Sequence, residues 1–159
     1  MVPEAAIPQV GARIMDLQNP TAKMSKSVDS AGTVFVIEDP ARTAKKIRSA
    51  VTDSEREVRY DVAAKPGIAN LLAIMSTVTG RPIPELEAEF GDGGYGPFKA
   101  AVADAVVEHL APVRARYDEL VRDTAALGAI LTRGAEKAEA MAGPVVARAR
   151  AAMGLLART

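Results

Sequence analysis

Two lysines with a methionine and a serine between them form the most chemically suggestive segment of the sequence, Lys23-Met-Ser-Lys-Ser27. Ammonium groups act as point charges and serine hydroxyls as hydrogen-bond donors, so a loop with this spacing can wrap around a polyphosphate. The bare pattern consists of common residue types, however. An ordinary solvated surface loop explains these five residues, taken alone, equally well.

The rest of the composition excludes several other kinds of site. The 159 residues include no cysteine and one histidine, His109. The chain therefore has no disulfide, no thiolate metal site, no cysteine nucleophile and no mechanism or metal site that needs two imidazoles. We predict no metal ligands in it. The formal net charge is zero, so the molecule as a whole has no field that attracts nucleic acid.

Neither a membrane span nor a secretion signal is predicted. No apolar run approaches the roughly 20 residues that a spanning helix needs. The amino-terminal residues, MVPEAAIPQV, lack both a basic region and an apolar core of the signal-peptide type. We therefore expect a soluble cytoplasmic protein that does not bind membranes.

Charge is unevenly distributed along the chain. Residues 51–109 carry 5 Lys/Arg against 10 Asp/Glu, whereas residues 110–159 carry 8 against 5. The last twenty residues contain Arg148, Arg150 and Arg158 and no acid. These arginines either solvate an exposed helix face or contact phosphates, and we name them as candidate tRNA-binding residues for the reasons given below.

The elements that must position the two lysines come from different structural classes. Residues 11–17 and 33–37 have the composition of short strands, and the polar stretch 21–32 between them is a long loop. Two lone strands are marginal in water, so this region needs a sheet that the sequence does not contain.

The remainder of the sequence predicts helices. Asp39-Pro40 starts a basic helix over 41–51, and further helices are expected over 65–78 and 84–90. The longest helix carries an apolar stripe from Phe98 to Leu120 that continues through Pro112. Two more helices, 124–132 and 134–155, complete an antiparallel bundle, so the fold is mainly α.

The lysine segment and its surroundings resemble the tryptophanyl-tRNA synthetases, a family of class I aminoacyl-tRNA synthetases. Lys-Met-Ser-Lys-Ser is one of the two signature motifs of that class. The family pattern also matches Gly11–Leu17, Lys45–Ser54, Lys65–Leu72 and Gly94–Lys99, in the right order. The resemblance implies that the helical bundle is preceded by the last strand and the ATP (KMSKS) loop of a Rossmann-like α/β catalytic domain.

The resemblance also implies roles for individual residues. Lys26 and Lys23 are the implied catalytic residues, which stabilise charge on the departing pyrophosphate when the loop closes. The implied ATP-binding residues are Ile14, Lys23, Met24, Ser25, Lys26 and Ser27, with Ile14 and Met24 contacting adenine through their backbones. ATP with Mg²⁺, tRNA(Trp) and L-tryptophan are the implied substrates, and the full-length form is implied to be a homodimer.

The chain departs from the family pattern mainly by what it lacks. The His-x-Gly-His motif and the tryptophan pocket are missing, so the chain resembles only the C-terminal half of such an enzyme and is expected to be inactive alone. Residues 1–38 are expected to be a remnant of the catalytic domain, and residues 39–159 a helical tRNA anticodon-binding domain. The alternative is a non-catalytic helical RNA-binding or scaffold module derived from a synthetase. Whether the chain is a cloned fragment or a natural truncation stays open.

Overall fold

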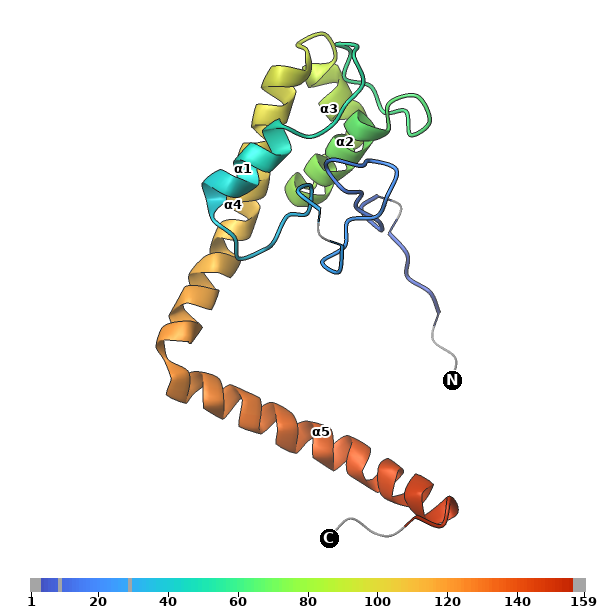
Figure 1. Ribbon diagram of the computed structural model, residues 1–159, viewed down its shortest axis with the longest axis vertical. Coiled ribbons are helices and arrows are strands. Elements are labelled where there is room, and N and C mark those ends of the chain that lie inside the picture. The colour runs from blue at the N-terminus through green and yellow to red at the C-terminus, as the bar shows by residue number, and fades with distance from the viewer. Residues whose placement is uncertain (1–3, 9, 29, 156–159) are drawn as a thin grey trace. The chain divides into compact units, whose positions relative to one another are not determined.

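The computed structural model describes residues 4–8, 10–28 and 30–155, and within these ranges its regular elements are helices (Figure 1). They are α1 (Pro40–Arg48), α2 (Pro66–Thr79), α3 (Ile83–Phe90), α4 (Tyr95–Arg122) and α5 (Thr124–Ala152). The chain divides into two units, residues 1–114 and 115–159, which are described separately. The predicted mainly α fold is confirmed. No helix in the described ranges is long and apolar enough to cross a membrane.

Helix boundaries follow the local signals in the sequence. The Asp39 carboxylate accepts a hydrogen bond from the Arg42 backbone N–H at 3.1 Å and caps α1, with Pro40 in its first turn. Helix α2 ends at Gly80, whose φ of 72° lies in the left-handed region. Pro112 lies inside α4 without ending it, as predicted.

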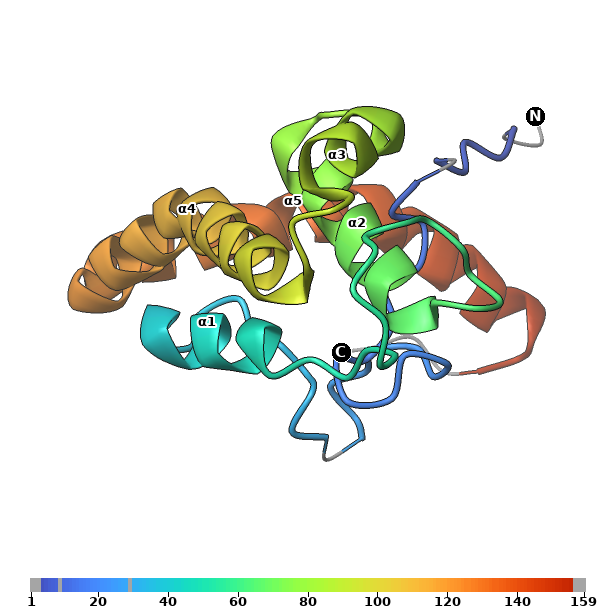
Figure 2. The ribbon, with the colours of Figure 1, turned by 90° about the horizontal axis from the view of Figure 1, so that it is seen from above.

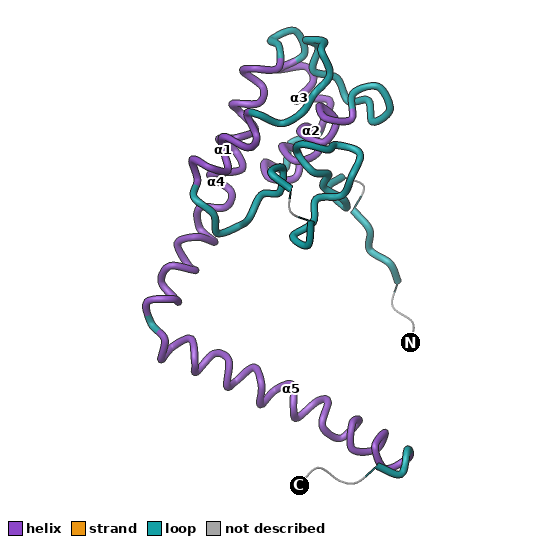
Figure 3. The backbone as a smooth tube through the Cα atoms, in the orientation of Figure 1, coloured by secondary structure: helices purple, strands orange, loops and turns teal. Residues whose placement is uncertain are grey.

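The two predicted strands, 11–17 and 33–37, are wrong, because the described residues between 10 and 39 form loops and turns (Figure 3). The trace of strand pairing in this described part is an isolated bridge between Met15 and Lys23. A strand is stable only beside other strands, and the described residues contain no sheet for it to join. The backbone of Met15 instead bonds to the side chain of Asn70 in α2.

The core of the first unit combines the helices with the amino-terminal loop. Views from two directions show α1 alongside α4 (Figure 1, Figure 2). An Arg48–Asp104 ion pair at 3.5 Å and an Arg114–Thr43 hydrogen bond at 3.1 Å join these two helices. The larger buried apolar side chains of the core are Leu17, Ile47, Val58, Ile68, Leu71, Leu72, Met75, Leu86, Phe98, Val102 and Val106.

A buried ammonium group joins the loop before α2 to the start of α4. The Lys65 side chain is 2% exposed, forms an ion pair with Glu55, and lies 3.4 Å from Asp53 Oδ1 and 3.1 Å from the Tyr95 hydroxyl. The Tyr95 hydroxyl in turn donates to Asp53 Oδ1 at 2.5 Å. The hydrogen bond to Glu55 raises the pKa of Lys65 against the opposing effect of burial. A charge this deeply buried is stable only while it is paired, so this cluster fixes the loop geometry.

Only half of the predicted apolar stripe on α4 is buried in the described structure. Phe98 and Val102 are fully buried and Val106 nearly so, but Val113 and Tyr117 are 48% and 44% exposed. The expectation that the stripe is a core face up to Leu120 is therefore wrong beyond Leu110. The apolar residues of α4 keep their spacing beyond Leu110, but those at Val113 and Tyr117 are not covered by another described element.

The carboxy-terminal region forms one helix, α5, where the sequence analysis predicted two. The helix continues through Pro144 and through Gly134, the predicted break, since glycine costs only about 1 kcal/mol relative to alanine inside a helix. None of its described side chains is buried. The buried contacts of the bundle therefore come from α1 to α4.

The two halves of α4 predict a contrast in stability. Phe98→Ala removes a fully buried ring and should lower the free energy of unfolding by about 3–5 kcal/mol. Tyr117→Ala, at an exposed position of the same helix, should change it by about 0.5 kcal/mol or less. Urea unfolding of the 159-residue chain, followed by circular dichroism, measures both values. Equal losses in the two variants would contradict the assignment of the core.

Candidate functional site

The two lysines lie on a loop, residues 20–33, which we call the lysine loop. Its arms are held by backbone hydrogen bonds to the segment that precedes it. The Met24 N–H donates to the Ile14 carbonyl at 3.0 Å, the Asp16 N–H to the Ala22 carbonyl at 2.8 Å, and the Leu17 N–H to the Gly32 carbonyl at 3.3 Å. The structure thus brings together Ile14 and Met24, the two residues predicted to contact adenine.

The Asp16 side chain closes the base of the lysine loop. Its Oδ1 accepts the backbone N–H groups of Gln18 at 2.8 Å and Asn19 at 3.0 Å, and its Oδ2 lies 3.5 Å from the Thr33 hydroxyl. Gly32 passes so close that a Cβ there would lie 2.2 Å from Asp16 Oδ1 and 2.5 Å from the Gln18 nitrogen. One carboxylate therefore ties both ends of the loop together, and only glycine fits beside it.

Hydrogen bonding keeps Asp16 ionised although the residue is 4% exposed. Burial by itself would raise the pKa of this carboxyl, but hydrogen bonds from Ser30, Gln18, Asn19 and Thr33 outweigh that effect and hold the pKa below its usual value. The carboxylate is therefore charged at neutral pH, which strengthens its hydrogen bonds.

Both ammonium groups of the lysine loop point to solvent. Lys23, Lys26 and Ser27 are exposed, whereas Met24 and Ser25 are half-buried. Within the described part of the chain, neither Lys23 nor Lys26 has an ion pair or a side-chain hydrogen bond. Ser25 Oγ accepts the Ser27 N–H at 3.3 Å, which keeps the turn tight. Two cations on a loop with fixed ends are free to bind an anion.

An apolar cavity lies beneath the lysine loop. Its volume is about 240 Å³, and its lining includes the side chains of Ile14 and Met24 from the loop region together with Ile74 and Val78 from α2. His109, which is exposed, stands at the same cavity. The half-buried sides of Ile14 and Met24 therefore face apolar groups. The Ile14 carbonyl and the Met24 N–H bond to each other, so the Ile14 N–H and the Met24 carbonyl, which have no hydrogen-bond partner among the described residues, are the backbone groups that a ligand can use.

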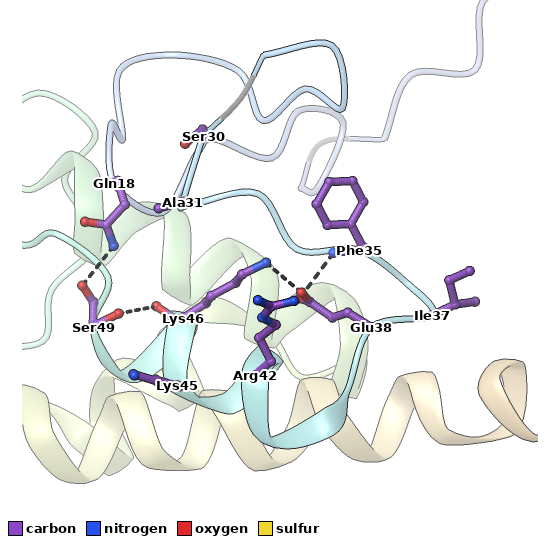
Figure 4. Close-up of a pocket in the computed structure, with 10 residues that line it drawn as sticks. All are labelled: Gln18, Ser30, Ala31, Phe35, Ile37, Glu38, Arg42, Lys45, Lys46 and Ser49. Atoms are coloured by element: carbon purple, nitrogen blue, oxygen red, sulfur yellow. Dashed lines mark hydrogen bonds and ion pairs between the residues drawn. The ribbon is translucent and has the colours of Figure 1, made fainter.

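The basic helix α1 has fewer available charges than its sequence indicates. Lys46 donates to Glu38 at 2.6 Å and to the Thr33 carbonyl at 2.7 Å, at the edge of an open pocket beside the lysine loop (Figure 4). Arg48 pairs with Asp104. Arg42 and Lys45 are exposed and line the same pocket, and their cationic groups have no partner among the described residues.

The predicted tRNA-binding arginines belong to the second unit. Arg148 is exposed on α5, and Arg150 is half-buried in a pocket lined by α5 and Leu155. Arg158 lies outside the described residues. Of these two arginines, Arg148 is accessible to solvent, whereas Arg150 is partly enclosed by the residues of this pocket.

Two residues that shape the site were missed by the sequence analysis. Asp16 precedes Gln18, Asn19 and Pro20, and an acid before such turn-forming residues is a recognisable capping signal. Asn70 has no such local signal, since its partner Met15 is 55 residues away. Only the packing of α2 against the loop reveals it.

The Asp16 contacts predict a pH-dependent stability. Because the folded-state pKa of Asp16 is below its unfolded value of about 3.9, its contribution is complete above that pH and declines as the pH falls through the folded-state pKa. Asp16→Asn should lower the free energy of unfolding at pH 7 by about 1–3 kcal/mol, and the gap to wild type should narrow toward pH 3. Urea titrations at pH 7, 5 and 3 measure this, with exposed Asp118→Asn as control. A gap that stays constant over this range would contradict the account.

Comparison with known proteins gives one consistent family. The family model described as tRNA synthetases class I (W and Y) matches residues 2–111. A tryptophan–tRNA ligase of Oceanobacillus iheyensis is 48% identical over 155 residues, which are 97% of this chain and 47% of the relative. A tryptophan–tRNA ligase of Mycobacterium leprae is 46% identical over 98% of this chain and 46% of its own length. The chain thus spans about half the length of these curated relatives.

Solved structures give the same result. The tryptophanyl-tRNA synthetase of Mycoplasma pneumoniae matches 94% of this chain with a TM-score of 0.79 and 30% identity, over 47% of its own chain. The Campylobacter jejuni enzyme, solved with ADP and tryptophan, matches 96% of this chain with a TM-score of 0.67 and 29% identity. On the family match over most of its length, the chain belongs to the class I tRNA synthetases of the tryptophan and tyrosine type.

Proposed function

We propose that the chain is the C-terminal half of a tryptophan–tRNA ligase. Its relatives bear that name and are about twice as long. In this proposal residues 1–38 supply the ATP loop and residues 39–159 the helical tRNA-binding domain. The chain alone is inactive, since the family's histidine motif and tryptophan pocket belong to the half outside it. The complete enzyme acts as a cytoplasmic homodimer.

The observation that carries the proposal is the pair of exposed ammonium groups, without partners among the described residues, on a loop whose base is fixed by Asp16. During activation, a carboxylate oxygen of tryptophan attacks the α-phosphorus of ATP, and pyrophosphate leaves with the electrons of the broken bond. Lys26 and Lys23 stabilise the negative charge that builds on this leaving group. Ser25 and Ser27 contact the phosphates, while the backbones of Ile14 and Met24 receive adenine.

Magnesium enters this proposal with the nucleotide. The described residues contain no group of three or more His, Asp or Glu side chains that could hold a metal ion. Mg²⁺ commonly binds through substrate phosphates and keeps several waters, so such a group is not required for a Mg²⁺–ATP substrate. We assign no residue of this chain to the ion and no step to it.

Each of the two units carries its own candidate tRNA contacts. Arg42 and Lys45 of α1 lie beside the lysine loop with their charges unpaired in the described structure, and Arg148 is exposed on α5. Arg150 and Arg158 are the other sequence candidates for contact with tRNA(Trp). Phosphate contacts of this kind supply affinity without base specificity.

The rival function is a non-catalytic RNA-binding or scaffold module. Exposed lysines can contact RNA phosphates in such a module as well, so their lack of partners does not separate the two functions. The position of Lys23 and Lys26 in the signature motif of the family, within the matched residues 2–111, favours the ligase. The two functions separate cleanly in an assay of tryptophan activation.

The variant Lys26→Ala, measured in an assay of tryptophan activation, tests the ligase function. In a full-length ligase that carries this segment, the substitution should slow tryptophan-dependent ATP–pyrophosphate exchange about 10²–10³-fold, because a donor aimed at transition-state charge is lost. The affinity for tryptophan should change little. Lys137→Ala, at an exposed position of α5, is the matched control and should leave the rate unchanged. An exchange rate within a factor of two of wild type for Lys26→Ala would rule out the ATP-loop role.

The tRNA surface is tested by salt dependence. Replacing Arg42 and Lys45 by glutamine should weaken tRNA binding and reduce the log–log salt slope by roughly 1.4–1.8, as expected for two lost phosphate contacts. Arg59→Gln with Arg81→Gln removes the same charge from cations that already have ion-pair partners, and should have less effect on the slope. Fluorescence titrations of tRNA at about 50 and 200 mM salt measure both. Equal slopes for the two double variants would place the tRNA surface elsewhere.

A further inference from the structure

Asn70 makes an unusual pair of hydrogen bonds to one backbone residue. Its Oδ1 accepts the Met15 N–H at 2.9 Å, and its Nδ2 donates to the Met15 carbonyl at 2.9 Å. A neighbouring strand would satisfy Met15 in the same way, through one acceptor and one donor. The side chain of a helix residue therefore replaces the missing strand at the start of the lysine loop.

The pairing depends on the amide of Asn70. An aspartate carboxylate accepts hydrogen bonds but cannot donate to the Met15 carbonyl, and leucine can do neither. Glutamine carries the same amide one methylene further from the helix, where the two 2.9 Å distances cannot both be kept without movement. Asn70 is 6% exposed, and Met15 is half-buried and lines an open pocket together with it, so removing the amide leaves the Met15 N–H without its protein partner and open to exchange with water.

The helix that carries Asn70 gives it a firm base. Ile68, Leu71 and Leu72, its neighbours on α2, are fully buried in the core of the first unit. Gly67 lies in the first turn of the helix, at a position where a Cβ would lie 2.2 Å from the Val51 carbonyl oxygen. Helix α2 is thereby packed closely on the loop that precedes it, and its position determines where Asn70 holds Met15.

Met15 lies between Ile14, whose backbone is proposed to contact adenine, and Asp16, which closes the base of the lysine loop. On one side, the Ile14 carbonyl accepts the Met24 N–H. On the other, Asp16 closes the base of the lysine loop. A shift of Met15 therefore moves Ile14 and Met24 together, and it changes the orientation of the lysine loop relative to Asp16.

We infer that Asn70 is a positioning residue for ATP, holding Met15 so that the Ile14 and Met24 backbones stand where adenine is received. The inference rests on the proposed function. Asn70 itself touches neither ATP nor the reacting atoms. Its loss should impair ATP recognition and leave tryptophan recognition intact, since the pair acts only on the nucleotide side of the reaction.

The first part of the test uses the 159-residue chain. Asn70→Leu, which keeps the size of the side chain, should speed amide hydrogen exchange of Met15 at least tenfold. The Val51 amide, which donates to the Leu17 carbonyl at 2.8 Å, should keep its protection. Asn70→Asp, which retains the acceptor, should give an intermediate rate. Unchanged exchange at Met15 in Asn70→Leu would show that the amide does not hold it.

The second part of the test measures the kinetics of tryptophan-dependent ATP–pyrophosphate exchange in the full-length ligase. Asn70→Leu should raise the KM for ATP on the order of tenfold and leave the KM for tryptophan within twofold. Met75→Ala, equally buried on α2, should lower the melting temperature without this split between the two KM values. A matching loss of stability with no change in the KM for ATP would reduce Asn70 to a purely structural residue and overturn the inference.

Lys26→Ala separates this inference from the proposed function. If Lys26→Ala slows adenylation and Asn70→Leu leaves the KM for ATP unchanged, the positioning role fails while the ATP loop stands. If Lys26→Ala has no effect on adenylation, the proposed function fails, and the role inferred for Asn70 fails with it.

Discussion

The organisation of this chain depends on satisfying the backbone polar groups of residues 14–33 without a sheet. Buried N–H and carbonyl groups must find partners, and these residues have no neighbouring strand in the described structure. Side chains take that role. The Asp16 carboxylate accepts the N–H groups of Gln18 and Asn19, and the Asn70 amide pairs with Met15. The loop that carries the two lysines is therefore built on polar side chains that are themselves buried in the core.

The distribution of paired and unpaired charge separates structure from function. Lys65 and Lys46 use their ammonium groups within the fold, the first in a buried cluster and the second against Glu38. Lys23 and Lys26 have no such partner among the described residues. A cation that is already neutralised contributes little to anion binding. The candidate residues for binding an anionic ligand therefore lie on the lysine loop and beside it.

The apolar face of α4 is buried only along the part of the helix that packs against other described elements. The stripe on α4 is buried at Phe98 and Val102 and exposed at Val113 and Tyr117, although its period does not change. Helix α5 continues the apolar pattern with no buried side chain among those described. Relatives twice the length of this chain share its fold over nearly all of it. An amphipathic period in the sequence thus shows that a helix face can be buried. In the described structure only part of the apolar face of α4, and none of α5, is buried.

Helix positions and the lysine motif were predictable from the sequence because their signals are local. Asp39-Pro40, Gly80 and the spacing on α4 act within a few residues, and the order of motifs identified the family. The strands at 11–17 and 33–37 were wrong, because strand formation depends on neighbours rather than on composition. The roles of Asn70 and Lys65 were not predictable, since their partners lie 55 and up to 30 residues away. The sequence by itself determined where helices α1 to α4 form and which cations are present, but it divided α5 into two helices. Only the tertiary structure decided which cations are paired and what holds the loop, because contacts between distant residues form only when the helices pack.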